Sequence, residues 1–210
     1  MKVKLKAMTQ SVDGMNIEQY LIHCARVSNP ENRMHHETAP KLLKYLIDAG
    51  HWSPFEMVSI GFEIETSRAI AQQLLRHRSF SFQEYSQRYS KVVGIESIEI
   101  REQAESNRQS SSDVTDDWDA VVSDLIRYST DVYNTMIDGG AAKETARMVL
   151  PLATTTTLVM NGTLRSWIHF LDQRCSSHAQ KEIRDIALEI KGSLSKICPW
   201  TSEALGWVEQ

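Results

Sequence analysis

Hydrophobic and polar residues alternate in several short segments of the chain, and this alternation predicts strands. It is present over residues 3–7 and is clearest over 57–66, where four apolar residues share one face: Val58, Ile60, Phe62 and Ile64. Successive side chains of a strand point to opposite faces, so a period of two indicates a strand buried on one side. Residues 92–100 and 152–160 are also predicted to be strands, because apolar and β-branched residues dominate both.

Other segments carry apolar residues at the three- and four-residue spacing of a helix. They are residues 17–28, 39–50, 67–78, 141–150 and two segments between 164 and 196. In the segment 39–50, Pro40 lies in the expected first turn and Gly50 at the expected end, as is typical of helix termini.

A longer helix is predicted to end at Gly139 and Gly140, because paired glycines favour a helix C-terminus. Its apolar residues are Trp118, Val122, Leu125, Val132 and Met136. Asp113 or Thr115 is expected to cap its first turn, since both side chains accept hydrogen bonds from backbone N–H groups. The polar run before it, at about 101–113, predicts a mobile loop.

This order of elements favours an α+β fold in which a mixed or antiparallel sheet packs with helices. The chain has 210 residues, which is long enough to bury a substantial core. The sequence contains no internal repeat and no linker-like segment, so a single domain over residues 1–210 is expected.

Charge and cysteine content narrow the classes of function. The formal net charge is -4, so a general attraction to nucleic acid or to anionic membranes is not expected. Cys24, Cys175 and Cys198 form no C-x-x-C motif, which indicates neither a zinc site nor a disulfide framework and fits a cytoplasmic location. The first ten residues do not look like a signal peptide, and no apolar run approaches the length of a membrane span.

Against this acidic background, cations concentrate in RHRSFSFQEYSQRYS, which begins at Arg76. Two interpretations fit this stretch. In the first, Arg76, His77 and Arg78 follow a helix and favour the negative end of its dipole, while Glu84 pairs with one arginine at the surface. In the second they form an anion pocket, because a guanidinium presents a fixed fork of donors to phosphate.

The residues around this stretch add chemistry to the pocket interpretation. If residues 84–88 are extended, then Glu84, Ser86 and Arg88 share one face and offer an acceptor, a hydroxyl and a cation together. Gln73 precedes Arg76 by three residues, so the two are neighbours on a helix.

A second group of cations lies in NGTLRSWIHFLDQRCSSHAQKEIR. On a helix, Arg165 and His169 lie one turn apart, and so do Arg174 and His178. Taken alone, this segment is better explained as two exposed cation pairs than as a binding site, and so is Arg147 further upstream.

Several common catalytic signatures are missing from the sequence. MHHETAP begins like the zinc motif H-E-x-x-H, but Pro40 stands where the second ligand is needed, and no metal is expected. The glycines form neither G-x-G-x-x-G nor a P-loop, so a nucleotide has to bind by another route. No serine or cysteine lies in a recognisable nucleophile motif.

Taken together, the segments resemble one protein family. Arg-His-Arg, seven residues and then Ser-x-Arg is the signature of flavin-dependent thymidylate synthases, and residues 76–78 and 86–88 match it. The segments CARVS, GHWSPFEM, ARMVLPL, LRSWIHFLDQR and SSHAQKEI are similar to further family segments and follow in the same order. The resemblance spans most of the chain and implies the fold of that family.

The resemblance also implies a function, an enzyme that makes dTMP from dUMP. The methylene group comes from 5,10-methylenetetrahydrofolate, and reducing equivalents come from NADPH through FAD. Family members are homotetramers with four sites at subunit junctions, so the same assembly is expected here.

The site residues of the family carry over to this chain position by position. Those implied beside the flavin are Ser53, Arg76, His77, Arg78, Glu84, Thr163, Leu164, Arg165 and His169. Those implied around dUMP are Gln73, Arg76, Glu84, Tyr85, Ser86, Gln87, Arg88, Arg147 and Arg174. Arg174 is expected at the uracil edge, where a guanidinium stabilises negative charge as N3 ionises and C5 becomes nucleophilic. Many relatives have Asn in place of Thr163, and some have Asn in place of His169.

The alternative from another class of function is a nucleotide- or RNA-binding module without turnover. In that case Phe80, Phe82, Tyr85 and Tyr89 would stack on bases while the arginines hold phosphates. The acidic net charge counts against this alternative.

Overall fold

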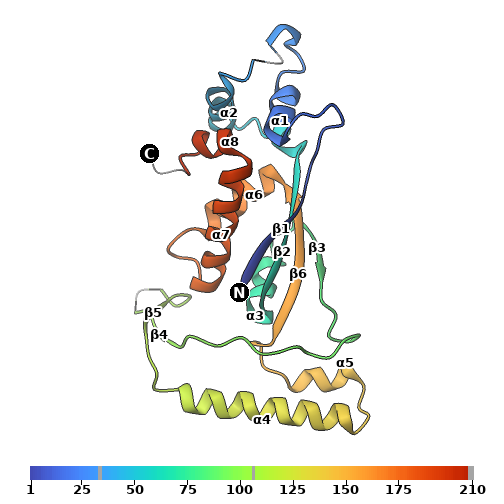
Figure 1. The fold of residues 1–210 in the computed structure, drawn as a ribbon. Helices are drawn as coiled ribbons and strands as arrows, with labels where there is room; N and C mark the ends of the chain where they lie inside the picture. Colours follow the sequence, from blue (N-terminus) through green and yellow to red (C-terminus); the bar gives the residue numbers. More distant parts are fainter. Residues whose placement is uncertain (33–34, 106, 208–210) are drawn as a thin grey trace.

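A four-stranded antiparallel sheet forms the centre of the protein in the computed structural model, which describes residues 1–32, 35–105 and 107–207. The strand order is β1-β2-β6-β3, and each neighbouring pair is antiparallel (Figure 1). The strands are β1 (Lys2–Met8), β2 (Ser59–Ser67), β3 (Ser81–Glu84) and β6 (Thr155–Thr163). The predicted α+β fold with an antiparallel sheet is therefore confirmed.

The alternation of apolar residues in β2 determines how the sheet meets the core. Strand β2 pairs with β6 along its whole length, from Ser59 opposite Thr163 to Ser67 opposite Thr155. The apolar side chains on the inner face of this pair are buried: Ile60, Phe62, Ile64, Leu158 and Met160. The strand predicted over 57–66 is confirmed within two residues, whereas β6 begins three residues later than predicted.

Helices α3 (Arg68–Leu74), α6 (Leu164–Arg174) and α7 (Lys181–Ile197) pack against this inner face (Figure 1). Helix α3 starts at the residue after β2, and α6 starts at the residue after β6. Trp167 of α6 donates a hydrogen bond from Nε1 to the carbonyl of Ile60 at 2.9 Å, and its ring meets that of Phe62 edge to face. These short connections hold the residues of both helices at fixed positions relative to the strand ends.

A second group of helices covers one end of the sheet, with α1 (Ile17–Ala25), α2 (Ala39–Asp48) and the unpredicted α8 (Pro199–Ala204) (Figure 1). Glu18 of α1 is buried and accepts hydrogen bonds from the backbone N–H groups of Trp200 and Thr201, at 2.9 and 2.7 Å. Burial raises the pKa of the Glu18 carboxyl despite these hydrogen bonds. This carboxyl therefore connects the first helix to the last.

The strand predicted over 92–100 is wrong. Only Ile95 forms a bridge there, to Thr154, and two backbone hydrogen bonds join the segment to residues just before and at the start of β6. Thr155 donates to the carbonyl of Gly94, and Glu96 donates to the carbonyl of Ala153. A glycine in the middle of the apolar run and this single short contact leave no continuous ladder.

The loop predicted at about 101–113 is also wrong in part, because its two ends pair as the strands β4 (Arg101–Gln103) and β5 (Ser111–Val114). Helix α4 (Asp119–Asp138) follows, and neither Asp113 nor Thr115 caps it, since its N-cap is Trp118. The hydroxyl of Thr115 accepts instead from the N–H of Asp117 at 3.3 Å, before the helix begins.

Helix α4 lies beside α5 (Lys143–Ala146) and a 3-10 turn, η3 (Arg147–Val149), and Figure 1 shows these elements beyond the end of the sheet. The helix predicted over 141–150 is thus divided into two short pieces. All three cysteines have free thiols. Within the described ranges, no helix combines the length and the apolar character that a membrane crossing requires.

Candidate active site

The Arg-His-Arg motif lies in a turn immediately after α3. The backbone N–H groups of Arg76 and His77 donate to the carbonyls of Gln73 and Leu74, and the chain then turns back into β3. Arg76 and Arg78 are exposed, whereas His77 is half-buried. The motif therefore lies at the negative end of the helix dipole and also presents two guanidinium groups at the surface.

His77 and Arg174 come from distant parts of the sequence and meet in this turn. Arg174 is the last residue of α6, and its Nε donates to Nε2 of His77 at 2.9 Å. Because Nε2 accepts this bond, the imidazole carries its proton on Nδ1. The edge of the ring also contacts Phe170, with centroids 4.9 Å apart.

The surroundings of His77 keep its ring neutral at neutral pH. Burial, and to a lesser degree the positive charge of Arg174, lower the pKa of His77 to about 4. Burial also lowers the pKa of the Arg174 guanidinium, which still carries its charge. A neutral acceptor thus fixes the position of a partly buried cation.

Glu84, at the end of β3, has a different partner from the one expected. Its Oε1 accepts from Nη1 of Arg68 at 3.0 Å and from the hydroxyl of Thr156 at 2.9 Å. The surface interpretation, in which Glu84 pairs with an arginine of the motif, is therefore wrong about this partner. The reason is that β3 leads away from the motif and carries Glu84 to the start of α3, where Arg68 lies.

Residues after Glu84 form a turn, so the extended arrangement considered for 84–88 is wrong beyond Tyr85. The N–H groups of Tyr89 and Ser90 both donate to the carbonyl of Ser86, at 3.1 and 3.0 Å. Gln87 points inward with 4% of its surface exposed, and its Nε2 has no hydrogen-bond partner in the described structure. Such a buried donor is uncommon in folded proteins and is suited to a ligand acceptor.

The start of α6 brings further predicted residues next to the motif. Thr163 is the N-cap of α6, and its hydroxyl accepts from the N–H of Ser166 at 3.2 Å. The hydroxyl of Ser166 in turn donates to the carbonyl of Ser79, beside the motif, at 3.2 Å. Leu164 is fully buried. Thr163 therefore uses its oxygen to cap the helix.

The 3-10 turn η2 (Ser53–Glu56) lies against the outer side of α6. Glu56 forms an ion pair with Arg165. The Trp52 ring packs on the ring of His169, with centroids 4.6 Å apart and a tilt of 55°. Ser53, Arg165 and His169 are thus brought to one region by two elements that are far apart in sequence.

The side chain of Gln73, in the last turn of α3, bonds to Gln180, the N-cap of α7. Its Nε2 donates to Oε1 of Gln180 at 2.6 Å. Arg147 begins η3, and its described hydrogen bond goes to the carbonyl of Glu144 in the same segment. Arg88 is exposed. Within one chain, His77 and Arg174 are therefore joined directly. Arg88 and Arg147 lie on two other segments, after β3 and at the start of η3.

Sequence reasoning missed three polar residues at this site. Arg68 anchors Glu84, Gln180 holds Gln73, and Glu182 holds Gln180 through a hydrogen bond of 2.8 Å. None of the three is part of a spaced motif, and each acquires its partner only when separate helices pack together. The sequence pointed to Gln180 and Glu182 only through their place in the family-like segment SSHAQKEI.

Comparisons with known proteins place this chain in one class of enzyme. The family described as "Thymidylate synthase complementing protein" matches residues 11–200. The chain is 44% identical to a probable flavin-dependent thymidylate synthase of Paramecium bursaria Chlorella virus 1, over 99% of this chain and 100% of the relative. It is also 44% identical to the flavin-dependent thymidylate synthase of a Synechocystis strain, over 93% and 94% of the two chains.

A solved structure is similar over the whole fold. The UMP/dUMP methylase PolB from Streptomyces cacaoi, bound with 5-Br dUMP, superimposes with a TM-score of 0.83 and 28% sequence identity, covering 98% of this chain and 94% of that one. The α+β fold of this chain is therefore that of an enzyme class that methylates uracil nucleotides. Within that class, the chain is a member of the flavin-dependent thymidylate synthase family.

Proposed function

We propose that this chain catalyses the reductive methylation of dUMP to dTMP, with 5,10-methylenetetrahydrofolate as carbon donor and NADPH as reductant through FAD. Membership of the family and the names of the relatives support this reaction. The methylase bound with 5-Br dUMP supports dUMP as the substrate. In the structure, the observation that carries most weight is the 2.9 Å hydrogen bond between Arg174 and His77, which holds a cation beside the arginine motif.

The residues at the site fit a flavin dinucleotide and a nucleotide. Arg76 and Arg78 expose guanidinium groups, which suit phosphate oxygens, and Gln87 has a buried donor without a partner in the described structure. When FAD is bound it carries the hydride chemistry, and the protein supplies position and electrostatic field. For the flavin we propose Ser53, Arg76, His77, Arg78, Glu84, Thr163, Leu164, Arg165 and His169. For dUMP we propose Gln73, Arg76, Glu84, Tyr85, Ser86, Gln87, Arg88, Arg147 and Arg174.

Arg174 is the residue to which we assign a catalytic role. Its guanidinium is fixed at Nε by His77, which leaves its Nη atoms to face the uracil edge. A cation held in place stabilises the negative charge that develops when N3 loses its proton and C5 becomes nucleophilic. The partly buried position strengthens this effect, because less water screens the charge.

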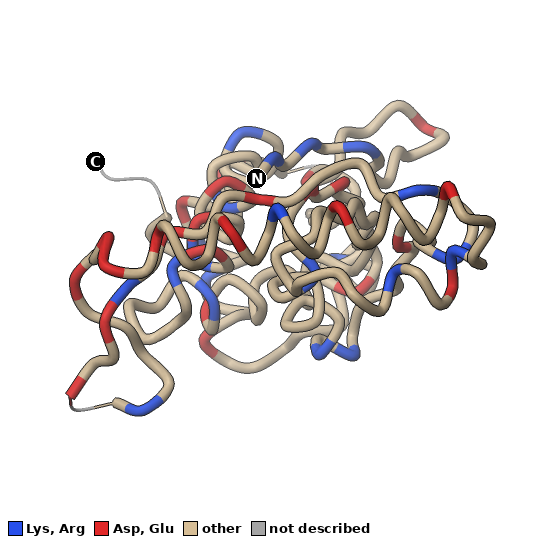
Figure 2. Tube along the Cα trace, turned by 90° about the horizontal axis from the view of Figure 1, so that it is seen from below, with Lys and Arg blue, Asp and Glu red and all other residues tan. Residues whose placement is uncertain are grey.

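The alternative of an RNA-binding module loses part of its basis in the structure. Phe80 is only 8% exposed and packs against Trp167 with ring centroids 4.6 Å apart, and Phe82 packs on the same core. The Phe80 ring is therefore not free to stack on bases, and part of the Phe82 surface is covered as well. Figure 2 shows Lys and Arg positions interspersed with Asp and Glu positions along the described part of the chain, whereas nucleic-acid binding relies on accumulated Lys and Arg.

We further propose a homotetramer whose sites combine residues from different chains. Four residues at the start of α4 are between 59% and 69% exposed: Trp118, Val121, Leu125 and Tyr128. Their spacing of three, four and three residues places them along one stripe of the helix, as in a packed helix–helix interface. Arg88 follows β3, Arg147 begins η3 and Arg174 ends α6, and this placement on three different segments of one chain supports the same assembly.

We also propose that residues 1–210 act as one domain and that the enzyme works in the cytoplasm. The four-stranded sheet and a connected hydrophobic core link the first strand to the last helix, which supports the single domain. Three cysteines with free thiols suit a reducing compartment.

Turnover under anaerobic conditions tests the proposed function. Purified protein loaded with FAD is expected to form dTMP from dUMP only when NADPH and methylenetetrahydrofolate are both present. Reactions that lack one component serve as controls. Folded protein that binds FAD and still forms no dTMP would contradict the reaction, and failure to bind FAD at micromolar concentrations would contradict the cofactor.

A further inference from the structure

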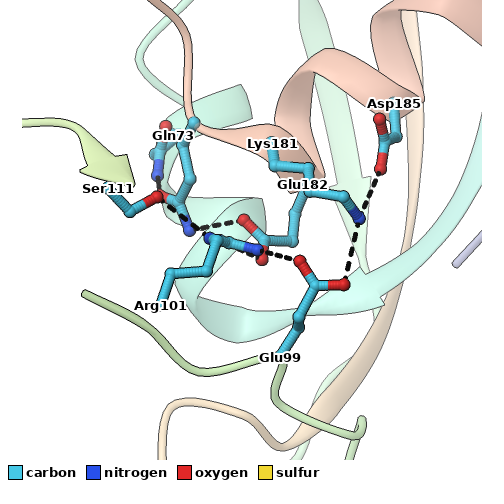
Figure 3. A network of polar contacts seen from close by, with 8 residues as sticks. Gln73, Glu99, Arg101, Ser111, Lys181, Glu182 and Asp185 are labelled. Atoms are coloured by element: carbon cyan, nitrogen blue, oxygen red, sulfur yellow. Dashed lines mark hydrogen bonds and ion pairs between the residues drawn. The ribbon is translucent and has the colours of Figure 1, made fainter. Parts of the chain in front are cut away.

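A continuous chain of polar contacts leads from the β4–β5 hairpin to Gln73 (Figure 3). Arg101 of β4 donates from Nη2 to Oε1 of Glu182 at 2.5 Å. The other oxygen of Glu182 accepts from Nε2 of Gln180 at 2.8 Å, and Oε1 of Gln180 accepts from Nε2 of Gln73 at 2.6 Å. Three separate elements, the hairpin, the start of α7 and the end of α3, are thus joined by side chains alone.

The hairpin end of this chain is firmly anchored. The Arg101 side chain is 10% exposed, and it also donates to Oε1 of Glu99 at 2.8 Å and to the hydroxyl of Ser111 at 2.9 Å. Lys181 lies between the carboxylates of Glu99 and Asp185, at 3.5 and 3.4 Å. Figure 3 shows these groups gathered around the start of α7.

The charge state of Glu182 follows from the same contacts. Burial alone would raise the pKa of its carboxyl, but hydrogen bonds from Arg101, from its own backbone N–H and from Gln180 together lower it. Glu182 is therefore a carboxylate at neutral pH and can only accept hydrogen bonds, while Arg101 can only donate them.

These two fixed ends determine the direction of every amide between them. The amide of Gln180 has to turn its Nε2 toward the carboxylate of Glu182, so its Oε1 faces Gln73. Gln73 has to turn its own Nε2 toward that oxygen. If either amide were reversed, two oxygens or two nitrogens would face each other. The oxygen of Gln73 is consequently held on the side away from α7.

We propose that Glu182 is a positioning residue which, through Gln180, sets the amide of Gln73 so that its oxygen accepts a hydrogen bond from dUMP. This inference rests on the proposed function, because it takes Gln73 to be a ligand of dUMP. Glu182 and Gln180 do not touch the nucleotide in this arrangement. Their effect is that only one orientation of the Gln73 amide places its donor opposite the acceptor oxygen of Gln180.

The substitution Glu182→Gln tests the donor-to-acceptor order of these hydrogen bonds, because glutamine has nearly the same shape as glutamate. The new amide turns its oxygen toward Arg101, so its nitrogen faces Gln180, and the amides of Gln180 and Gln73 both reverse. Gln73 then presents nitrogen where oxygen is needed. We expect dUMP to bind about tenfold more weakly, as for a hydrogen bond replaced by a mismatched pair. The measurement is titration of dUMP against the absorbance of bound flavin.

Glu99→Gln is the matched control, because it also removes a carboxylate that accepts from Arg101 but lies outside the path to Gln73. It should leave the dUMP affinity within about twofold of wild type. The midpoint of thermal unfolding and the affinity for FAD should be equal in the two variants. If Glu182→Gln and Glu99→Gln weaken dUMP binding to the same extent, the carboxylate of Glu182 has only a structural role and the proposal fails.

A double-mutant cycle shows whether Glu182 affects dUMP binding through Gln73 or through a general change in the protein. In a Gln73→Leu background, Glu182→Gln should weaken dUMP binding no further, whereas an undiminished loss would overturn the proposal. Gln180→Leu interrupts the series of hydrogen bonds at an exposed, uncharged residue and should also weaken dUMP binding. It replaces Glu182→Gln if that variant does not fold. Wild-type protein that binds FAD but gives no response to dUMP would contradict the proposed function itself, before any variant is compared.

Discussion

At the scale of single residues, the contact between Arg174 and His77 carries the most chemistry. The arginine is charged and partly buried, and its neutral partner contributes no charge that would weaken its field. A histidine that accepts from Nε restricts how the guanidinium can rotate. We therefore expect this pair to matter for the rate of reaction more than for the stability of the fold.

Arg174→Ala should abolish most dTMP formation while the protein stays folded and binds flavin. Loss of one preorganised donor to a developing charge typically lowers the rate by roughly a hundredfold or more. The measurement is anaerobic turnover at saturating dUMP, with flavin absorbance as the check on folding. Arg127→Ala, at an exposed ion pair on α4, is the control and should keep its activity. An Arg174→Ala rate within a few-fold of wild type would show that the assignment is wrong.

The lowered pKa of His77 predicts how stability depends on pH. The folded state holds this pKa at about 4, below the ordinary value of 6.5, so the unfolded state takes up a proton first as the pH falls. The stabilising contribution is present above about pH 6.5 and is lost progressively between 6.5 and 4. Urea unfolding at pH 7 and pH 5 measures this loss.

His77→Gln keeps an acceptor for Arg174 but does not titrate, so its urea midpoint should change less between pH 7 and pH 5 than that of wild type. The partly exposed position of His77 makes the expected difference modest. His178→Gln, at an exposed histidine, should behave like wild type. An identical pH dependence in wild type and His77→Gln would exclude His77 as the cause.

At the scale of elements, Glu18 is the clearest single connection, because it ties α1 to the start of α8. Glu18→Ala leaves the N–H of half-buried Trp200 and both the N–H and the hydroxyl of buried Thr201 without their acceptor. Each unsatisfied group of this kind costs about 1–3 kcal/mol. Because the structure relaxes around the substitution, we expect the free energy of unfolding to fall by about 1–3 kcal/mol in total. Chemical denaturation should show it, whereas Glu203→Ala on the exposed side of α8 should change the stability little. Equal stabilities for the two variants would contradict the structural role of Glu18.

The elements also show what the sequence could predict and what it could not. Strand β2 and helix α6 follow directly from periodicity, because each buries one face and keeps its polar residues on the other. Periodicity failed for 92–100 and for β4 and β5, where pairing depends on a neighbouring segment rather than on a buried face. Thr115 shows a similar limit, since its hydroxyl accepts a hydrogen bond from an N–H group of the turn before the helix instead of from the first turn of the helix.

The candidate site shows the same division between local and long-range information. The turn after α3 and the end of α6 were predictable as positions for cations, but the meeting of His77 with Arg174 is a contact over 97 residues. The pairing of Glu84 with Arg68 was missed for the same reason, since spacing along a chain does not state which helix end a strand returns to. The polar contacts from Arg101 to Gln73 depend on three packed elements, and their only trace in the sequence is that Gln180 and Glu182 lie in the family-like segment SSHAQKEI.

At the scale of the whole molecule, the proposed tetramer predicts that inactive variants can complement each other. Arg88 lies on the turn after β3 and Arg174 at the end of α6, and we propose that one dUMP site takes them from different chains. Closed symmetry repeats the same junction at every site of a homo-oligomer. A tetramer that mixes Arg88→Ala chains with Arg174→Ala chains therefore contains some junctions with both substitutions and others with neither.

Refolding the two inactive variants together should therefore restore part of the activity, because the junctions without a substitution are complete. Each variant refolded alone is the control and should stay inactive, and mass spectrometry of the intact assemblies measures how many mixed tetramers have formed. The recovered activity should rise with the fraction of mixed tetramers, since only they contain complete junctions. Mixed tetramers that form in quantity and remain inactive would place Arg88 and Arg174 of each site on the same chain.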